Sequence, residues 1–60
     1  MEHFEVIGNY PLCLTFQSDK TKRCINLSKA WIRKHFNGNV EDIISMDNTD
    51  DGNLIFNTLH

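Results

Sequence analysis

The sequence predicts an α+β fold: a small antiparallel sheet in the order β-β-β-α-β-β, with one amphipathic helix packed on one face. Three observations favour this fold. One segment alone has helical periodicity, alternating apolar residues precede it, and an Asp-Gly step separates two apolar runs after it. A chain of 60 residues has room for one domain, which we expect to span residues 1–60.

Three strands are predicted before the helix. Residues 3–7 alternate loosely and end at a Gly-Asn pair, which is typical of a turn. In residues 11–17, Leu12 is the first of three apolar residues that alternate with other side chains, as in a strand with one buried face. A polar turn follows, and residues 22–27 are predicted to form the third strand.

The pairing of the second and third strands can be predicted from burial. A turn centred on residues 19–20 places Leu14 opposite Ile25 and keeps the apolar side chains on one face. A turn centred one residue earlier places Cys13 opposite Cys24, but it sets an arginine opposite a leucine. Because burial of one face specifies the register, we prefer the first pairing, which disfavours a disulfide between the two cysteines.

The helix is predicted over residues 29–36, which contain no Gly or Pro. Ser28 is a suitable N-cap, because its hydroxyl can accept a hydrogen bond from a free amide of the first turn. At the other end, Asn37-Gly38 has the residue types that adopt the left-handed conformation closing a helix. The basic residues near this end suit the negative end of the helix dipole.

The helix has two chemically different sides. At about 100° per residue, the apolar side comprises Leu27, Trp31, Ile32, His35 and Phe36. We expect this side to hold the helix against the sheet, with Trp31 in the core and His35 partly buried. The opposite, solvent-facing side is expected to carry Lys29, Arg33 and Lys34.

The segment after the helix is predicted to form a helical turn following Asn39 and then a strand over residues 43–47. Residues 48–53 contain an Asp-Gly step between two apolar runs, which strongly indicates a hairpin. Residues 54–56 form the last predicted strand, and residues 57–60 are expected to be a short tail.

Charge is distributed unevenly along the chain. The net charge at pH 7 is −2, yet a window of +6 over positions 20–34 contrasts with −8 in the remainder. The basic residues are Lys20, Lys22, Arg23, Lys29, Arg33 and Lys34. The acidic residues are Glu2, Glu5, Asp19, Glu41, Asp42, Asp47, Asp50 and Asp51.

The basic window has three interpretations. It can be a solvated face balanced by the acidic residues, a nucleic-acid site whose affinity would fall steeply with salt, or a surface for an acidic protein partner. Our leading hypothesis is a small, non-enzymatic binding or regulatory module with a protein partner, and a nucleic-acid-binding regulator is the alternative. The residues predicted to contact the partner are Lys22, Arg23, Lys29, Arg33 and Lys34.

The acidic residues suggest a further alternative. Five of them lie within residues 41–51 and could imitate phosphate charge, as in a small inhibitor of a nucleic-acid-binding enzyme. The opposite charges of the two segments also permit head-to-tail self-association.

No catalytic, cofactor-binding or metal-binding residue is predicted, and we expect the protein not to be an enzyme. Enzymatic chemistry would have to use Cys13 or Cys24 with His35, and the sequence provides no geometry for such a pair. The two cysteines and the scattered histidines lack the spacing of a zinc site. Residues 47–53 resemble a calcium loop in composition but lack its closing Glu.

The sequence also suggests where the protein acts. It has no apolar run of about 18 residues, so no transmembrane helix and no membrane partner are expected. Its first residues are acidic and lack the long apolar region of a secretory signal. A cytoplasmic location with reduced cysteines is the resulting expectation.

Residues 4–57 resemble a family of small bacterial domains of unknown function, which occur alone or fused ahead of a helix-turn-helix DNA-binding region. The resemblance lies in a Leu12-x-Leu14-x-Phe16 strand, an Asp-containing turn, the Asn26-Leu27-Ser28 helix start and a closing Asp51-Gly52-Asn53-Leu54-Ile55-Phe56 hairpin. The chain departs from the family at Lys20, where a Gly is usual, and at Phe56, where a Trp is common. The resemblance implies an α+β fold and a non-enzymatic, regulatory or toxin–antitoxin-like role.

Overall fold

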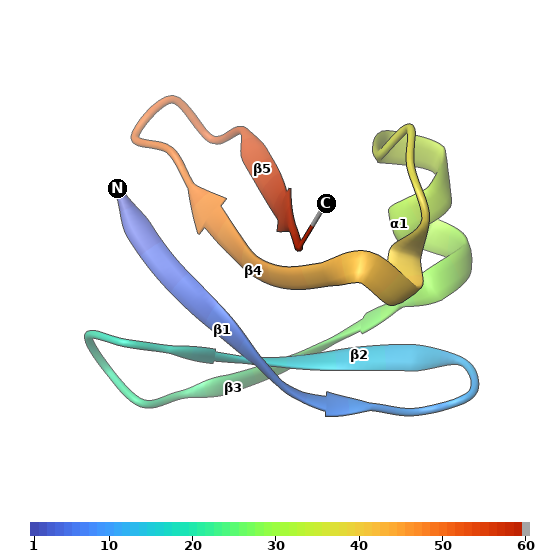
Figure 1. Cartoon of the computed structure of the whole chain (residues 1–60). Helices are drawn as coiled ribbons and strands as arrows, with labels where there is room; N and C mark the ends of the chain where they lie inside the picture. Colours follow the sequence, from blue (N-terminus) through green and yellow to red (C-terminus); the bar gives the residue numbers. More distant parts are fainter. Residues whose placement is uncertain (60) are drawn as a thin grey trace.

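In the computed structural model, which describes residues 1–59, the chain forms a five-stranded antiparallel sheet with one α-helix on one face (Figure 1). The elements are β1 (Glu2–Asn9), β2 (Cys13–Ser18), β3 (Cys24–Ser28), α1 (Lys29–His35), the 3₁₀ turn η1 (Val40–Asp42), β4 (Ile43–Asn48) and β5 (Leu54–Thr58). The predicted α+β class and the β-β-β-α-β-β order are therefore confirmed.

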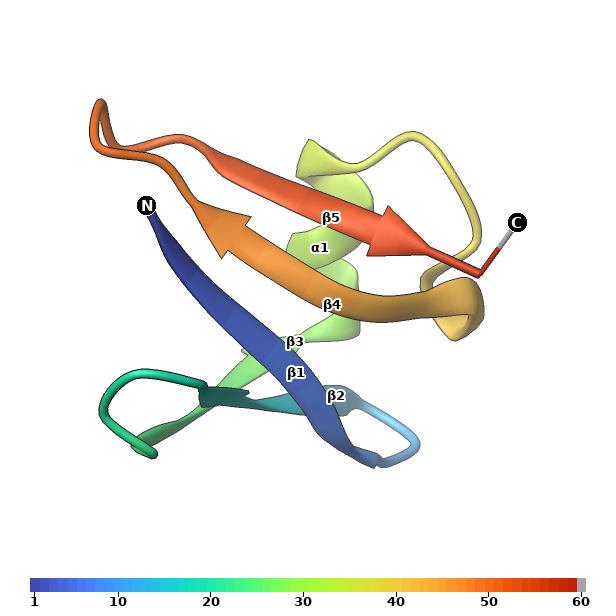
Figure 2. The same ribbon diagram turned by 60° about the vertical axis from the view of Figure 1, so that its left-hand side comes forward.

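The centre of the sheet is β1, which pairs with β2 on one side and with β4 on the other, giving the order β3-β2-β1-β4-β5. The right-handed twist common to sheets turns the β2–β3 hairpin away from the β4–β5 hairpin. Figure 2 shows the two hairpins diverging and α1 lying behind β4 and β5. The two edge strands, β3 and β5, are both short.

The core lies between α1 and the inner face of the sheet. Its buried apolar residues are Phe4, Leu14, Phe16, Ile32, Val40, Ile43 and Met46. Alternate residues of β2 are buried, as the period of two predicted. Leu12, expected on the same face, is instead 82% exposed. This residue precedes β2, in the turn, where its carbonyl oxygen accepts a hydrogen bond of 2.9 Å from the amide of Lys29.

The pairing of β2 with β3 differs from the predicted register. Leu14 pairs with Leu27, and Phe16 pairs with Ile25, so the predicted pairing of Leu14 with Ile25 was wrong by two residues. The connecting turn lies one residue further along the chain and includes Lys22, whose φ is 65°. A shift of two residues preserves the face on which each side chain lies, so the same apolar residues still point inward.

The start of α1 follows the prediction, and its end does not. The Ser28 hydroxyl accepts a hydrogen bond of 3.3 Å from the amide of Trp31, so Ser28 is the N-cap. The helix ends at His35, and Phe36 is extended, with φ −132° and ψ 126°. No left-handed residue follows it, because the Phe36 ring leaves the helix direction to pack against Phe56, with ring centroids 5.7 Å apart.

The C-terminal half agrees closely with the predicted elements. Asn39 caps η1 through a 3.0 Å hydrogen bond from the amide of Glu41, and β4 follows at once. The hairpin turn contains Gly52 with φ of 90°, a conformation that glycine adopts without strain. β5 extends through Thr58, so the tail predicted over residues 57–60 was wrong for its first two residues; His60 lies outside the described residues.

Candidate functional site

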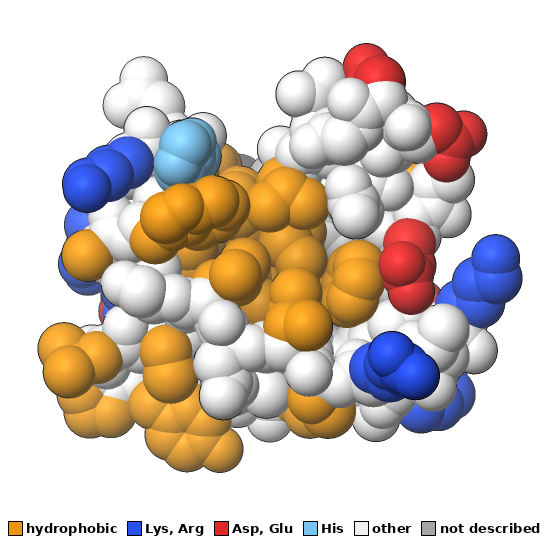
Figure 3. All heavy atoms as spheres, turned by 180° about the vertical axis from the view of Figure 1, so that it is seen from behind, with side chains coloured by type: hydrophobic (Ala, Val, Ile, Leu, Met, Phe, Trp, Pro, Cys, Tyr) orange, Lys and Arg blue, Asp and Glu red, His pale blue; other side chains and the backbone are white. Residues whose placement is uncertain are grey.

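The face that carries α1 exposes hydrophobic side chains, which Figure 3 shows gathered across its middle. We define the apolar strip as Ile25 and Leu27 of β3, Trp31 of α1 and Leu54 of β5. Ile25 is 38% exposed and Trp31 is 40% exposed, whereas Leu27 and Leu54 are half-buried against the core. The strip remains accessible because a helix of seven residues is too short to cover a five-stranded sheet.

Trp31 forms one wall of an open cleft at the end of the strip nearest the β4–β5 turn. The cleft measures about 380 Å³, and its lining residues are Trp31, His35, Gly52, Asn53 and Leu54. The His35 ring lies against the Trp31 ring, with centroids 4.4 Å apart and planes inclined at 40°. Trp31 was expected in the core and His35 was expected to be partly buried, and both are exposed.

The exposure of Trp31 and His35 has a simple geometric cause. The buried side of α1 is formed by Lys29 and Ile32, with Phe36 half-buried just beyond the last turn. The helix is therefore rotated about its axis relative to the prediction, and Trp31 and His35, one turn apart, face the cleft instead of the sheet. A helical wheel could identify these two rings as neighbours, but it could not show which side of the helix met the sheet.

The other end of the strip reaches a second, shallower hollow of about 560 Å³. Its lining residues are Glu2, Phe4, Thr21, Arg23 and Ile25. Phe4 belongs to the core and forms the floor, while Arg23 and Thr21 come from the loop between β2 and β3. Apolar surface therefore meets a guanidinium group at this end.

Lys29 does not belong to the basic surface on which it was predicted. It is 5% exposed, and its ammonium group donates hydrogen bonds to Asn9 Oδ1 at 2.7 Å and to Glu41 Oε2 at 2.8 Å. The Asn9 amide in turn donates to the other carboxylate oxygen of Glu41, at 2.9 Å. These bonds join β1, α1 and η1, and they hold the pKa of Glu41 below its usual value, with Lys29 as the largest cause and Asn9 as the next.

The other predicted partner-binding residues are exposed but dispersed. Lys34 lies three residues from Trp31, so the two are neighbours on the helix surface. Arg33 lies toward Glu41, and its positive charge lowers the pKa of that carboxyl, after the larger effects of Lys29 and Asn9. Lys22 and Arg23 are at the opposite end of the strip. The structure therefore places Lys34 and Arg23, of the predicted set, beside the exposed apolar surface, and Figure 3 shows Lys and Arg side chains at both ends of it.

The residues considered for catalysis are not brought together. Cys13 pairs with Ser28 and Cys24 with Gln17, and both thiols are free. His35 lies against Trp31, and no hydrogen bond within residues 1–59 links it to either cysteine. The described part of the chain also contains no helix long and apolar enough to cross a membrane.

Comparison of the chain with known protein families, with characterised proteins and with solved structures finds no match. The resemblance to small bacterial domains of unknown function therefore remains a prediction from the sequence pattern.

Proposed function

We propose that the protein is a small, non-enzymatic module that binds a protein partner, and that the apolar strip takes an extended apolar segment of that partner with acidic residues near its ends. The observation that carries this proposal is the exposure of Trp31 in an open cleft. Large apolar side chains that stay in solvent at the edge of a concave surface mark interaction sites more often than chance placement does.

The position of Trp31 suits it to act as an anchor. Its ring packs against the His35 ring, and Trp31 lies in the first turn of α1, which Ser28 caps. A side chain already fixed in one orientation loses little conformational entropy on binding, so more of its contact energy contributes to affinity. Trp is also among the residues most enriched at the energetic centres of protein interfaces.

Charge supports an acidic segment as the occupant. Arg23 lies at one end of the strip and Lys34 next to the Trp31 end, so acidic residues flanking an apolar stretch would meet a cation at each end. The molecule measures 26 × 22 × 20 Å. A strip that crosses it has room for about six residues of an extended segment, at about 3.3 Å per residue.

Nucleic acid fits this surface less well. The burial of Lys29 removes one of the five predicted basic contacts, and the strip offers a single exposed aromatic ring among the residues described. Proteins that bind single strands use several aromatic platforms along a basic groove. The separation of Lys34 from Arg23 by apolar surface is better suited to a peptide than to a continuous phosphate backbone.

The proposal can be tested by affinity capture from the native host, followed by titration of the purified partner. Trp31 is the only tryptophan of the chain, so its fluorescence reports directly on the cleft. We expect partner binding to shift its emission to shorter wavelength as the ring loses contact with water. We expect Trp31→Ala to weaken binding about 30-fold, the effect of losing an interface anchor of about 2 kcal/mol.

Ile55→Ala provides a matched control, because Ile55 is 48% exposed and alternates with Leu54 onto the other face of β5. Arg23→Glu and Lys34→Glu should each reduce the association rate, increasingly so at low salt. A partner that binds Trp31→Ala as well as the wild type would sink the proposal, provided that circular dichroism shows the variant to be folded. Binding of single-stranded DNA at low salt, lost in the same variants, would support the nucleic-acid alternative instead.

A further inference from the structure

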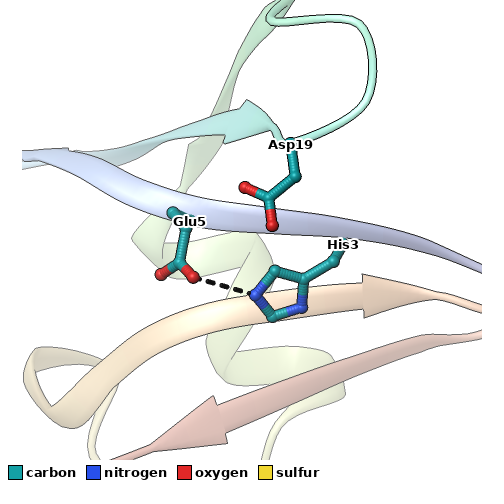
Figure 4. A group of neighbouring side chains, drawn as sticks. All are labelled: His3, Glu5 and Asp19. Atoms are coloured by element: carbon teal, nitrogen blue, oxygen red, sulfur yellow. Dashed lines mark hydrogen bonds and ion pairs between the residues drawn. The ribbon is translucent and has the colours of Figure 1, made fainter.

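A second group of side chains lies on the outer face of the sheet, opposite to α1. His3 and Glu5 are two residues apart in β1, so both point outward, while Phe4 between them points into the core. Asp19 directly follows β2, and its amide donates a 2.9 Å hydrogen bond to the His3 carbonyl oxygen. The backbone therefore fixes all three residues next to one another, as Figure 4 shows.

The three side chains direct atoms that can serve as metal ligands toward one point. A ring nitrogen of His3 and one carboxylate oxygen each of Glu5 and Asp19 lie within 4.8 Å of one another, and His3 Nε2 is 3.0 Å from Glu5 Oε1. Ligands of a tetrahedral zinc ion, with bonds of about 2.0–2.2 Å, are separated by about 3.3–3.5 Å. Glu5 and Asp19 are both exposed, so their side chains have room to rotate toward that spacing.

The imidazole ring is held from its other side by a second carboxylate. His3 Nδ1 lies 2.6 Å from Asp47 Oδ1 on β4, and the Asn57 side chain on β5 donates a 3.0 Å hydrogen bond to Asp47 Oδ2. Metal-binding histidines are typically oriented in this way, with a carboxylate on one nitrogen and the metal on the other. Asp47 and Asn57 therefore prepare His3 Nε2 to act as a ligand.

The charge of the cluster favours a cation. Three carboxylates surround one imidazole, and the ion pairs within residues 1–59 bring no Lys or Arg to any of them. His3 is the only group among them that can carry positive charge, so a bound dication would compensate the excess negative charge.

We propose that His3, Glu5 and Asp19 bind a divalent transition-metal ion, for which zinc is the best match, with Asp47 as the positioning residue for the histidine. One nitrogen and two carboxylate oxygens form a ligand set typical of zinc, and water would complete the coordination. Magnesium prefers oxygen ligands in an octahedral arrangement and suits the histidine poorly. The bound ion would link β1 to the loop after β2.

The sequence did not reveal this group. Spacing rules for zinc sites look for His and Cys residues near one another in the chain, whereas Asp19 is brought to His3 by the β1–β2 pairing, and Asp47 by the β1–β4 pairing. An i, i+2 pair of His and Glu on a strand was the one local signal available.

The test is isothermal titration calorimetry of Zn²⁺ into the untagged, folded chain at neutral pH, with Mg²⁺ in parallel. We expect one zinc ion per chain and no detectable heat with Mg²⁺. Asp19→Asn, a change in an exposed residue that leaves the core untouched, should weaken zinc binding at least 10-fold. Asp47→Asn should weaken it by about 10- to 100-fold, as is typical of residues that orient a ligand histidine.

Two matched controls exclude other sites for zinc. His35→Ala removes a histidine on the other face, and a Cys13→Ser, Cys24→Ser double variant removes both thiols; neither should change the affinity. Nitrogen NMR of the imidazole rings should show zinc bound at Nε2 of His3. Failure to bind zinc, or binding that survives Asp19→Asn but is lost with the cysteines, would overturn the proposal. Neither result bears on the apolar strip, which lies on the opposite face.

Discussion

At the scale of single residues, Trp31 and Lys29 occupy environments opposite to those predicted. Lys29 is buried because its aliphatic stem can cover apolar surface while its ammonium group is bound by Asn9 and Glu41. Those partners come from β1 and η1, and no helical periodicity contains that information. The helical pattern alone predicts an amphipathic helix correctly, but it ranks Trp above Lys for burial and so rotates the helix away from its true orientation.

Lys22 supplies a prediction at this scale. Its φ of 65° places a residue with a Cβ in the left-handed region, which costs roughly 1 kcal/mol and which asparagine tolerates better. We expect Lys22→Asn to raise the free energy of unfolding by roughly 0.5–1 kcal/mol, measured as a higher urea midpoint at unchanged slope. Lys20→Asn, in the same turn but without positive φ, should have no such effect. Equal shifts in both variants would contradict this account.

At the scale of elements, the sequence predicted most of the fold. Ser28, the alternation in β2 and the Asp-Gly step at residues 51–52 are local signals, and the structure confirms the element that each one indicated. The β2–β3 register was wrong because it depends on how many residues the turn contains, and Lys22 does not have the residue type that usually marks a left-handed position. The candidate site was less predictable, since its cleft joins α1 to a turn that lies far along the chain.

The contribution of the helix N-cap to stability can be measured at Ser28. Ser28 ends β3, and its hydroxyl caps α1 at the junction of the two elements. We expect Ser28→Ala to destabilise the protein by about 1 kcal/mol, which in a chain of this size lowers the melting temperature by about 4–8 °C. Ser28→Asp should retain most of the stability, because aspartate caps equally well. If the alanine and aspartate variants melt together, the hydroxyl is not acting as a cap.

At the scale of the whole molecule, two opposite surfaces are supported by one thin core. The apolar strip lies over the inner face of the sheet, and the group formed by His3, Glu5 and Asp19 lies on the outer face of the same sheet. A domain of this size is marginally stable, so a few contacts that join separate elements contribute a large part of its folding stability. The Lys29–Glu41–Asn9 group is the main polar example, because it ties the helix and η1 to the central strand.

This group predicts how stability depends on pH. The folded state holds the pKa of Glu41 below its usual value, chiefly through Lys29 and then Asn9, so ionised Glu41 favours folding. Its contribution is complete above the unfolded pKa, at about pH 4.3, and is lost as the pH falls through the lower folded pKa. We expect the urea midpoint of the wild type to decrease between about pH 5 and pH 3. Glu41→Gln should be less stable at pH 7 and should show a smaller decrease, because its amide cannot titrate.

Asp42→Asn, one residue away in η1, serves as the control and should follow the wild-type curve. Parallel curves for the wild type and Glu41→Gln would show that the pairing of Glu41 with Lys29 contributes nothing to acid stability, whatever its geometry.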